Sequence, residues 1–176
     1  SLGVHIIREN AQKLGLTRNF TIFDRNDSRR AVKDAIVEIS LDPKQYEPNI
    51  ILSLISREKG NGKNLASFSE NVGNDYMREI IMKVWTKYEI SLQKEKALDF
   101  DDLLLKSAEL LEKDKSIRMY YQNVWRYIHI DEYQDTNKVQ YQLVRLITGD
   151  RKNICVVGDV DQNIYSWRGA DIKNIL

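Results

Sequence analysis

The sequence has few of the residues that define disulfide, zinc or membrane proteins. It holds one cysteine, Cys155, and two histidines, His5 and His129, among 176 residues. This excludes an internal disulfide and disfavours a zinc site. The apolar runs are far shorter than the roughly 18 residues that cross a bilayer, so we expect no membrane segment. No basic and then apolar stretch opens the chain, so we expect no signal peptide and a reduced, cytoplasmic location.

The chain also has almost no excess of one sign of charge. The chain has 27 Lys+Arg against 26 Asp+Glu, a net charge of +1. Bulk charge therefore does not indicate nucleic-acid binding, and any such site must be a local patch. A hydrophobic content of 42% and a charged content of 30% are typical of a globular chain rather than a disordered one. The length predicts one domain, or one with a small appendage.

Residues that break helices are few, with two prolines and eight glycines. We therefore expect long segments that are mostly helical. Apolar residues at helical spacing predict a first helix from Leu2 that stops at Gly15, since glycine tolerates the positive φ of a helix end. Asp27 or Ser28 is predicted to cap a second helix, and Pro48 to begin a third.

The middle of the chain predicts further helices. Residues 60–64, with the sequence GNGKN, predict a loop by composition. Residues 67–70 fit a capping box, from which we expect a long helix to reach about Glu95. Asp99 is predicted to begin another helix, and residues 117–124 to form a shorter one.

The pattern changes near residue 125. Residues 126–130 and 153–157 are short β-rich runs, with apolar residues at helical spacing between them over 139–147. Strand, helix and strand at this spacing predict a βαβ crossover with neighbouring parallel strands. The predicted fold class is therefore α/β and mostly helical. Ligands of such sheets bind beyond the carboxyl ends of the strands, and both runs end there in acidic residues.

The first β-rich run ends in Asp131 and Glu132. An apolar strand that ends in Asp-Glu is the arrangement of a Walker B motif. One carboxylate orders Mg²⁺ on a nucleotide, and its neighbour positions the attacking water. The alternative is that these acids, with Asp135, only lie in a loop and cap the next helix. Spacing alone does not decide between the two.

The second β-rich run ends in GDVDQN, residues 158–163. A calcium loop that starts at Asp159 is rejected, because its sixth and twelfth positions are Ile164 and Ala170 instead of Gly and Glu. Gln162 lies just beyond the strand and could instead contact a γ-phosphate.

Two aromatic residues and a cation follow, namely Tyr165, Trp167 and Arg168. Such a set can stack an unpaired base and hold a phosphate. Without other information, core packing of Trp167 and a surface position for Arg168 are the favoured alternative.

A phosphate loop of the form GxxxxGK[ST] is missing. Gly62 and Lys63 resemble its end, but Arg57 stands where the first Gly is needed and Asn64 where Ser or Thr is needed. No other Gly-Lys-Ser/Thr occurs. The chain therefore lacks the part that grips the β- and γ-phosphates.

Taken together, residues 127–137 (YIHIDEYQDTN) and 157–170 (VGDVDQNIYSWRGA) resemble motifs II and III of the UvrD/PcrA/Rep helicases of superfamily 1. Residues 98–103 (LDFDDL) resemble a segment that these helicases carry shortly before motif II. Residues 1–5 resemble the continuation of their Thr-Phe-His-Ser motif. The resemblance covers essentially the whole chain, with its sharp motifs in the last third.

The resemblance implies a fragment of an ATP-dependent 3′-to-5′ DNA helicase. In that family two RecA-like domains bind ATP at their interface, and each carries a helical insertion. Residues 1–14 and 96–176 would form part of the first RecA-like domain (1A), with a partial parallel sheet. Residues 15–95 would form its helical insertion (1B), which contacts duplex DNA.

The resemblance also implies ATP and Mg²⁺ as cofactors, and single-stranded and duplex DNA as partners, of the intact protein. Asp131 would ligate Mg²⁺, Glu132 would act as the catalytic base, and Gln162 would sense the γ-phosphate. The surface for single-stranded DNA would consist of Tyr165, Trp167 and Arg168, with Trp167 stacked on a base.

Departures from the family pattern limit this expectation. The phosphate loop, the adenine-reading Gln, the arginine fingers and the second RecA-like domain have no counterpart here, so we expect the chain alone to be inactive. The alternative is a non-catalytic module that keeps the fold and binds DNA or a protein. Candidate duplex contacts are Arg57, Lys59 and Lys63, against the alternative of a solvated loop.

Overall fold

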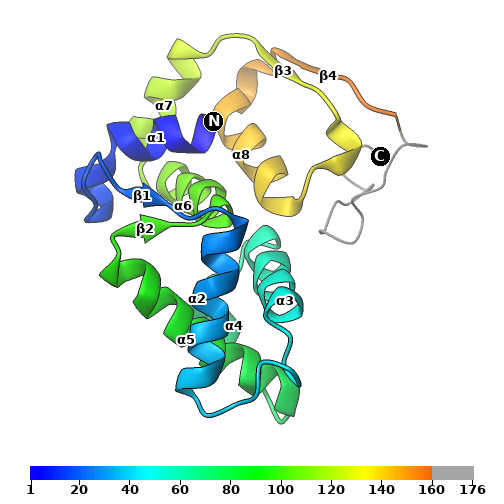
Figure 1. Cartoon of the computed structure of the whole chain (residues 1–176). Helices are drawn as coiled ribbons and strands as arrows, with labels where there is room; N and C mark the ends of the chain where they lie inside the picture. Colours follow the sequence, from blue (N-terminus) through cyan, green and yellow to red (C-terminus); the bar gives the residue numbers. More distant parts are fainter. Residues whose placement is uncertain (160–176) are drawn as a thin grey trace. The chain divides into compact units, whose positions relative to one another are not determined.

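The computed structural model describes residues 1–159, and these form two compact units (Figure 1). The first unit comprises Ser1–Lys59 and Lys63–Leu103. The second comprises Gly60–Gly62 and the described residues from Leu104 onward.

The first unit is mostly helical, with one small sheet. Its elements are α1 (Leu2–Glu9), the 3₁₀ helix η1 (Ala11–Leu14), β1 (Thr21–Ile22), α2 (Arg25–Glu38), most of α3 (Pro48–Gly60), α4 (Leu65–Ser69), α5 (Tyr76–Lys94), β2 (Ala97–Leu98) and the start of α6 (Phe100–Lys113). Helices α2 and α5 pack along each other, as Figure 1 shows.

The core of the first unit lies mainly between α2, α3, α4 and α5. Phe68 and Trp85 meet there, with ring centroids 5.4 Å apart in a tilted arrangement. The buried apolar residues of this core are Ala31, Val32, Ala35, Ile36, Ile51, Leu52, Ile55, Phe68, Ile80, Ile81, Val84, Trp85, Tyr88, Leu92 and Ala97. On α2, α3 and α5 they recur at helical spacing, which is the pattern that predicts amphipathic helices.

Helix α2 begins earlier than the sequence pattern indicated. Asp24 is the cap, and its Oδ1 accepts the N–H groups of Asn26 and Asp27 at 2.7 and 2.8 Å. In turn, the carboxylate of Asp27 accepts the N–H of Asp24 at 3.3 Å, which completes a capping box. The prediction of Asp27 or Ser28 as the cap is therefore wrong, and Ser28 is buried.

Two other helix boundaries also differ from expectation. The first helix ends at Glu9 and continues as η1, which does end at Gly15, with φ of 68°. The long helix α5 begins at Tyr76 under an Asp75 cap instead of at residues 67–70, and it ends at Lys94, close to the predicted end. Residues 67–69 belong instead to the short helix α4.

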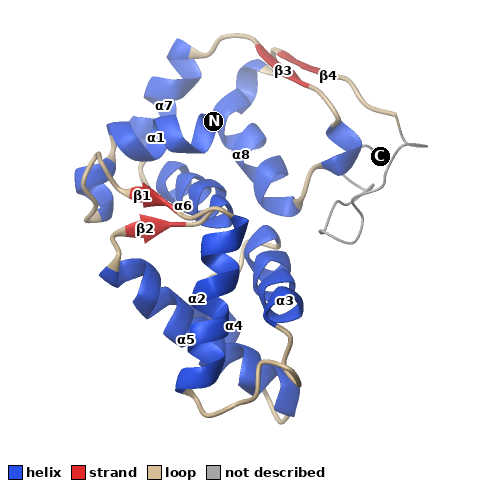
Figure 2. Cartoon of the chain, viewed as in Figure 1, coloured by secondary structure: helices blue, strands red, loops and turns tan. Residues whose placement is uncertain are grey.

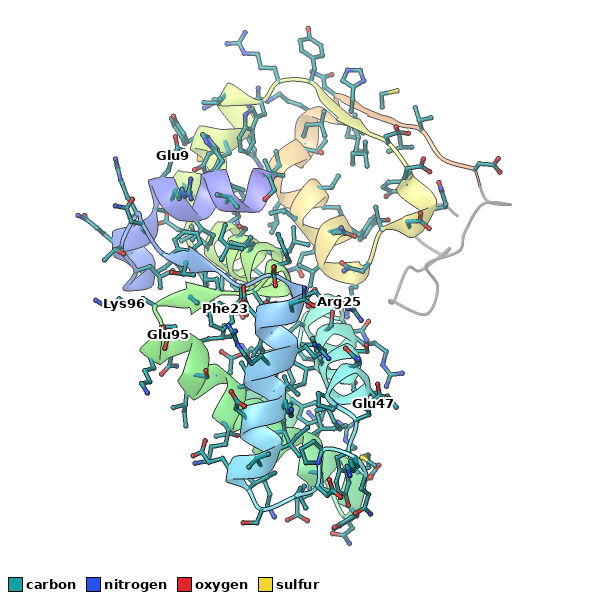
Figure 3. All side chains as sticks on the ribbon, viewed as in Figure 1. Glu9, Phe23, Arg25, Glu47, Glu95 and Lys96 are labelled. Atoms are coloured by element: carbon teal, nitrogen blue, oxygen red, sulfur yellow. The ribbon has the colours of Figure 1, made fainter. Side chains whose placement is uncertain are left out.

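A two-stranded parallel sheet in the first unit was not predicted. Strand β1 pairs with β2, with Thr21 opposite Ala97 and Ile22 opposite Leu98. Strands of two residues are too short to show a period-2 pattern in the sequence. Figure 3 labels Glu95 and Lys96, which form the turn that leads from α5 into β2.

The second unit contains the predicted βαβ arrangement. After the rest of α6 its elements are α7 (Lys115–Val124), β3 (Ile128–Ile130), the 3₁₀ helix η2 (Tyr133–Asp135), α8 (Lys138–Thr148), the 3₁₀ helix η3 (Gly149–Arg151) and β4 (Ile154–Val156). Strands β3 and β4 are parallel neighbours with α8 between them in the chain (Figure 2). The prediction of an α/β, mostly helical fold is confirmed.

The described residues offer no membrane-spanning segment. None of the helices within residues 1–159 combines the length and the apolar character that crossing a membrane requires.

Candidate functional site

The carboxyl ends of β3 and β4 lie at the same edge of their sheet, because the two strands are parallel. Asp131 and Glu132 directly follow β3, and residues 157–159 directly follow β4. The N–H of Val157 donates to the carbonyl of Ile130 at 2.8 Å, and the N–H of Tyr133 donates to the carbonyl of Val157 at 3.0 Å. The two segments that leave the sheet are thus bound to each other.

Glu132 has an unusual backbone conformation. Its φ of 51° and ψ of 41° lie in the left-handed region, which costs a residue other than glycine about 1–3 kcal/mol. Its N–H donates to Oδ1 of Asp131 at 2.9 Å. Its carbonyl accepts the N–H of Asp135 at 2.9 Å. Strained backbone of this kind concentrates at functional sites.

The next helix, α8, is not capped by the acidic residues. Asn137 is its cap: Oδ1 of Asn137 accepts the N–H of Gln140, and Oε1 of Gln140 accepts the N–H of Asn137, each at 2.9 Å. The acidic residues therefore do not cap this helix, and that part of the alternative interpretation is wrong. The side chains of Asp131 and Glu132 are exposed at the edge of the sheet instead.

Gln134 is a buried residue to which the sequence motifs assign no role. It is 1% exposed. Its Nε2 donates to Oε2 of Glu132 at 2.6 Å, and its Oε1 accepts the N–H of Asp159 at 2.9 Å. No spacing pattern marks this glutamine as buried, because its second partner, Asp159, is 25 residues away and only the folded sheet brings it near.

The acidic pair fits magnesium that is bound together with a nucleotide. Within residues 1–159 no group of three or more His, Cys, Asp or Glu side chains could hold a metal ion. Magnesium at nucleotide sites needs fewer protein ligands, since one or two carboxylates suffice when phosphates and waters supply the rest. The exposed carboxylate of Asp131 matches that donor set.

The other residues predicted for this site are Gln162, Tyr165, Trp167 and Arg168. They lie outside the described residues, and their roles stay predictions.

The three candidate DNA contacts near the end of α3 have different environments. Arg57 is exposed. The side chain of Lys63 is 39% exposed, and its Nζ lies 2.7 Å from Oε2 of Glu58. The side chain of Lys59 is only 1% exposed, so the prediction of a DNA contact at Lys59 is wrong. Lys59 continues the buried stripe that Ile51 and Ile55 begin on α3 at intervals of four residues, and that spacing is the signal that could have predicted its burial.

Three carboxylates surround the buried ammonium of Lys59. Its Nζ lies 2.8 Å from Oδ2 of Asp99, 2.8 Å from Oδ1 of Asp102 and 3.1 Å from Oε1 of Glu89. The hydroxyl of Tyr88 also donates to Oδ2 of Asp99 at 2.9 Å. We call these five residues the Lys59 cluster. All of them belong to the first unit.

Burial and charge act in opposite directions on the acids of the Lys59 cluster. Burial, and then the charge of Asp99, raise the pKa of Asp102 to about 7, against the lowering effect of Lys59. Burial also acts to raise the pKa of Asp99. The ammonium of Lys59 and the hydrogen bonds to Asp99 outweigh it, so that pKa is lowered. Burial disfavours the charged form of Lys59, but its carboxylate neighbours hold its pKa well above the ordinary value.

Comparison with known proteins identifies similar sequences over the whole chain. The profile of a family described as UvrD/REP helicase N-terminal domain matches residues 1–176. The ATP-dependent DNA helicase PcrA of Staphylococcus aureus strain Mu50 is 44% identical over 176 residues, which are 100% of this chain and 24% of that protein. PcrA of Staphylococcus epidermidis strain RP62A has the same identity and coverage, 44%, 100% and 24%. The chain thus spans about a quarter of the length of these curated relatives.

Proposed function

The chain belongs to the UvrD/REP helicase N-terminal domain family, and from this membership we propose that it is part of an ATP-dependent DNA helicase. In this proposal the carboxyl edge of the β3–β4 sheet is the part of the ATPase site that carries the metal ligand and the catalytic base. Residues 1–14 and 96–176 belong to the first RecA-like domain, and residues 15–95 form its helical 1B insertion.

One observation carries the proposal. Asp131 and Glu132 leave a parallel strand at the edge where sheets of this kind bind ligands, and they are exposed there. The same residues head the run DEYQDTN, by which the chain resembles motif II of the family. Geometry, residue type and family membership therefore point to the same chemistry.

The proposed mechanism assigns one task to each side chain. Asp131 holds the Mg²⁺ that accompanies ATP, and this ion would neutralise charge on the phosphate oxygens. Glu132 accepts a proton from the attacking water as general base. Gln162 contacts the γ-phosphate.

DNA is the proposed second substrate. Tyr165, Trp167 and Arg168 form the surface for single-stranded DNA, with Trp167 stacked on a base. The 1B insertion contacts duplex DNA. By its resemblance to the family, we propose that the intact enzyme moves from 3′ to 5′ and works in the cytoplasm.

We also propose that the 176-residue chain alone neither hydrolyses ATP nor unwinds DNA. The printed sequence contains no GxxxxGK[ST] run, and phosphoryl transfer in P-loop ATPases requires the phosphate grip as well as the metal ligands. A non-catalytic binding module with the same fold is the second candidate. It becomes the better one if the full-length gene also lacks a phosphate loop.

The test is ATP hydrolysis by the full-length protein and by its Glu132→Gln variant, with single-stranded DNA present. We expect the substitution to lower kcat about 10²- to 10⁴-fold, the usual contribution of a general base. Glu95→Gln is the control, because Glu95 is an exposed carboxylate in the turn after α5. Equal activity of the Glu132→Gln variant and the wild type would reject the assignment of Glu132.

A further inference from the structure

We propose that Gln134 is a positioning residue for Glu132, tying its carboxylate to the chain that leaves β4. This inference rests on the proposed function, because Glu132 has to be the catalytic base for its position to affect the rate. Gln134 is 1% exposed, and both ends of its amide are hydrogen-bonded.

The partners determine which way the amide points. The N–H of Asp159 can only donate, so it requires the carbonyl oxygen of Gln134, which it meets at 2.9 Å. The amino group is then left for Glu132, whose ionised carboxylate can only accept, and Nε2 to Oε2 is 2.6 Å. An amide of this length satisfies both partners at once. A carboxylate at this position could not donate to Glu132.

Gly158 makes room for this contact. A Cβ atom at Gly158 would lie 2.6 Å from Oε1 of Gln134, and 3.3 Å from the backbone nitrogens of Tyr133 and Gln134. Real Cβ atoms essentially never come as close as the first of these distances. A side chain at residue 158 would therefore push the amide of Gln134 out of this position.

The link restrains a side chain that is otherwise exposed. Glu132 lies at the edge of the sheet on a strained backbone, and a free glutamate there would sample many rotamers. A charge-assisted hydrogen bond from a buried partner restricts that choice. Catalytic groups work best when neighbouring side chains hold them within a fraction of an ångström of the reacting geometry. Gln134 therefore acts on the rate through Glu132, without contacting the substrate.

Steady-state ATPase kinetics of the full-length protein test the effect on catalysis. We expect Gln134→Ala and Gln134→Glu to lower kcat about 10-fold, with the KM for ATP changed less than about 2-fold, because the loss falls on the transition state. Gln134→Glu keeps the size of the side chain, so its effect does not come from a cavity. Gln122→Ala is the matched control: Nε2 of Gln122 donates to the carbonyl of Leu146 at 2.8 Å, between α7 and α8. We expect its kcat to be unchanged.

Amide hydrogen exchange in the 176-residue chain tests the link without any need for activity. We expect the Asp159 amide to exchange about 10-fold faster in Gln134→Ala than in the wild type, and to be unaffected by Gln122→Ala. Gly158→Ala should also speed this exchange. In the variant that carries both Gln134→Ala and Gly158→Ala, the Asp159 amide should exchange no faster than in either single variant, because both substitutions remove the same contact.

The outcomes separate the two proposals. A wild-type enzyme without ATPase activity rejects the proposed function and this inference with it. An active wild type whose Gln134 variants match Gln122→Ala in kcat rejects the positioning role alone. Unchanged exchange at Asp159 in Gln134→Ala rejects the link itself.

Discussion

Nζ of Lys59 and Oδ1 of Asp102 lie 2.8 Å apart in the interior of the first unit, although 43 residues separate them in the sequence. Two of the three acids around Lys59, Asp99 and Asp102, also exchange hydrogen bonds at the start of α6. The N–H of Asp102 donates to Oδ1 of Asp99 at 2.7 Å, and the N–H of Asp99 donates to Oδ2 of Asp102 at 3.3 Å. One pair of aspartates thus satisfies both a helix end and a buried cation.

Removal of the Lys59 ammonium should strongly destabilise the first unit. Lys59→Ala leaves Asp99, Asp102 and Glu89 without their common counter-ion, and breaking a buried ion pair costs about 3–5 kcal/mol. Urea denaturation followed by circular dichroism measures the change. Lys83→Ala is the control, because Lys83 forms an exposed pair with Glu79 on α5, and such pairs contribute about 1 kcal/mol or less. Similar losses in both variants would contradict this account.

The Lys59 cluster should make the free energy of unfolding depend on pH. The pKa of Asp102 is raised to about 7 in the folded chain, against about 3.9 when unfolded. The contribution of Asp102 to the free energy of unfolding is therefore fully present below pH 4. It is lost as the pH rises through 7, at up to about 1.4 kcal/mol per pH unit. The lowered pKa of Asp99 has the opposite effect: its contribution to the free energy of unfolding is lost as the pH falls below about 4.

Asp102→Asn tests this pH dependence, because asparagine cannot lose a proton. We expect the variant to lose less stability than the wild type between pH 5 and pH 8 in urea titrations. Asp34→Asn, an exposed position on α2, should retain the wild-type slope. Parallel slopes for Asp102→Asn and the wild type would show that Asp102 does not titrate in this range.

Gly3→Ala should destabilise the chain although alanine is the better helix former. A Cβ at Gly3 would lie 2.7 Å from the backbone oxygen of Leu103, which cannot rotate away as a side chain would. The gain in helix propensity is about 0.5–1 kcal/mol, and overpacking costs about 1–3 kcal/mol. We expect a net loss in urea denaturation, whereas Glu9→Ala on the same helix should change stability by about 0.5 kcal/mol or less. A more stable Gly3→Ala variant would contradict the close contact.

Among the three basic residues near the end of α3, Arg57 is the best remaining candidate for a duplex DNA contact. It is exposed, whereas Lys59 is buried and Lys63 faces Glu58. We expect Arg57→Gln to weaken duplex binding by the chain, and to reduce the slope of log affinity against log salt by about 0.9 if one phosphate contact is lost. Fluorescence anisotropy at several salt concentrations measures both. Lys33 is an exposed residue on α2. An equal effect of Lys33→Gln would show that the loss of net charge, and not the loss of a specific contact, weakens binding.

Periodicity and helix-start residues predicted those parts of the fold that depend on neighbours in the sequence. The βαβ unit, the helix that begins after Asp99 and the helix start at Pro48 were all predicted. Cap positions were less reliable, because several Asp, Ser and Asn residues near each helix start could serve. Asp24 caps α2 in place of Asp27, and Asn64 and Asp75 divide what looked like one long helix into α4 and α5.

The candidate site was predictable only in part. Asp131 and Glu132 follow a strand, so their place at the edge of the sheet comes from local sequence alone. The contact between Gln134 and Gly158 was not predicted, since it joins residues 24 positions apart across two strand ends. Lys59 is predicted as a duplex DNA contact, with a solvated loop as the alternative, and its position in the buried stripe of α3 contradicts both.

The sequence by itself determined most of the helical pattern, the βαβ unit with strands β3 and β4, and the acidic residues at the carboxyl edge of that sheet, because each depends on spacing along a short stretch of chain. Tertiary structure alone decided which polar residues are buried and what they bind. Lys59 is charged in the interior because three carboxylates converge on it, from α5, from the residue before α6 and from the first turn of α6. Gln134 can reach both Glu132 and Asp159 because parallel pairing brings two strand ends together. Burial of a polar group is stable only when its partners arrive from elsewhere in the fold.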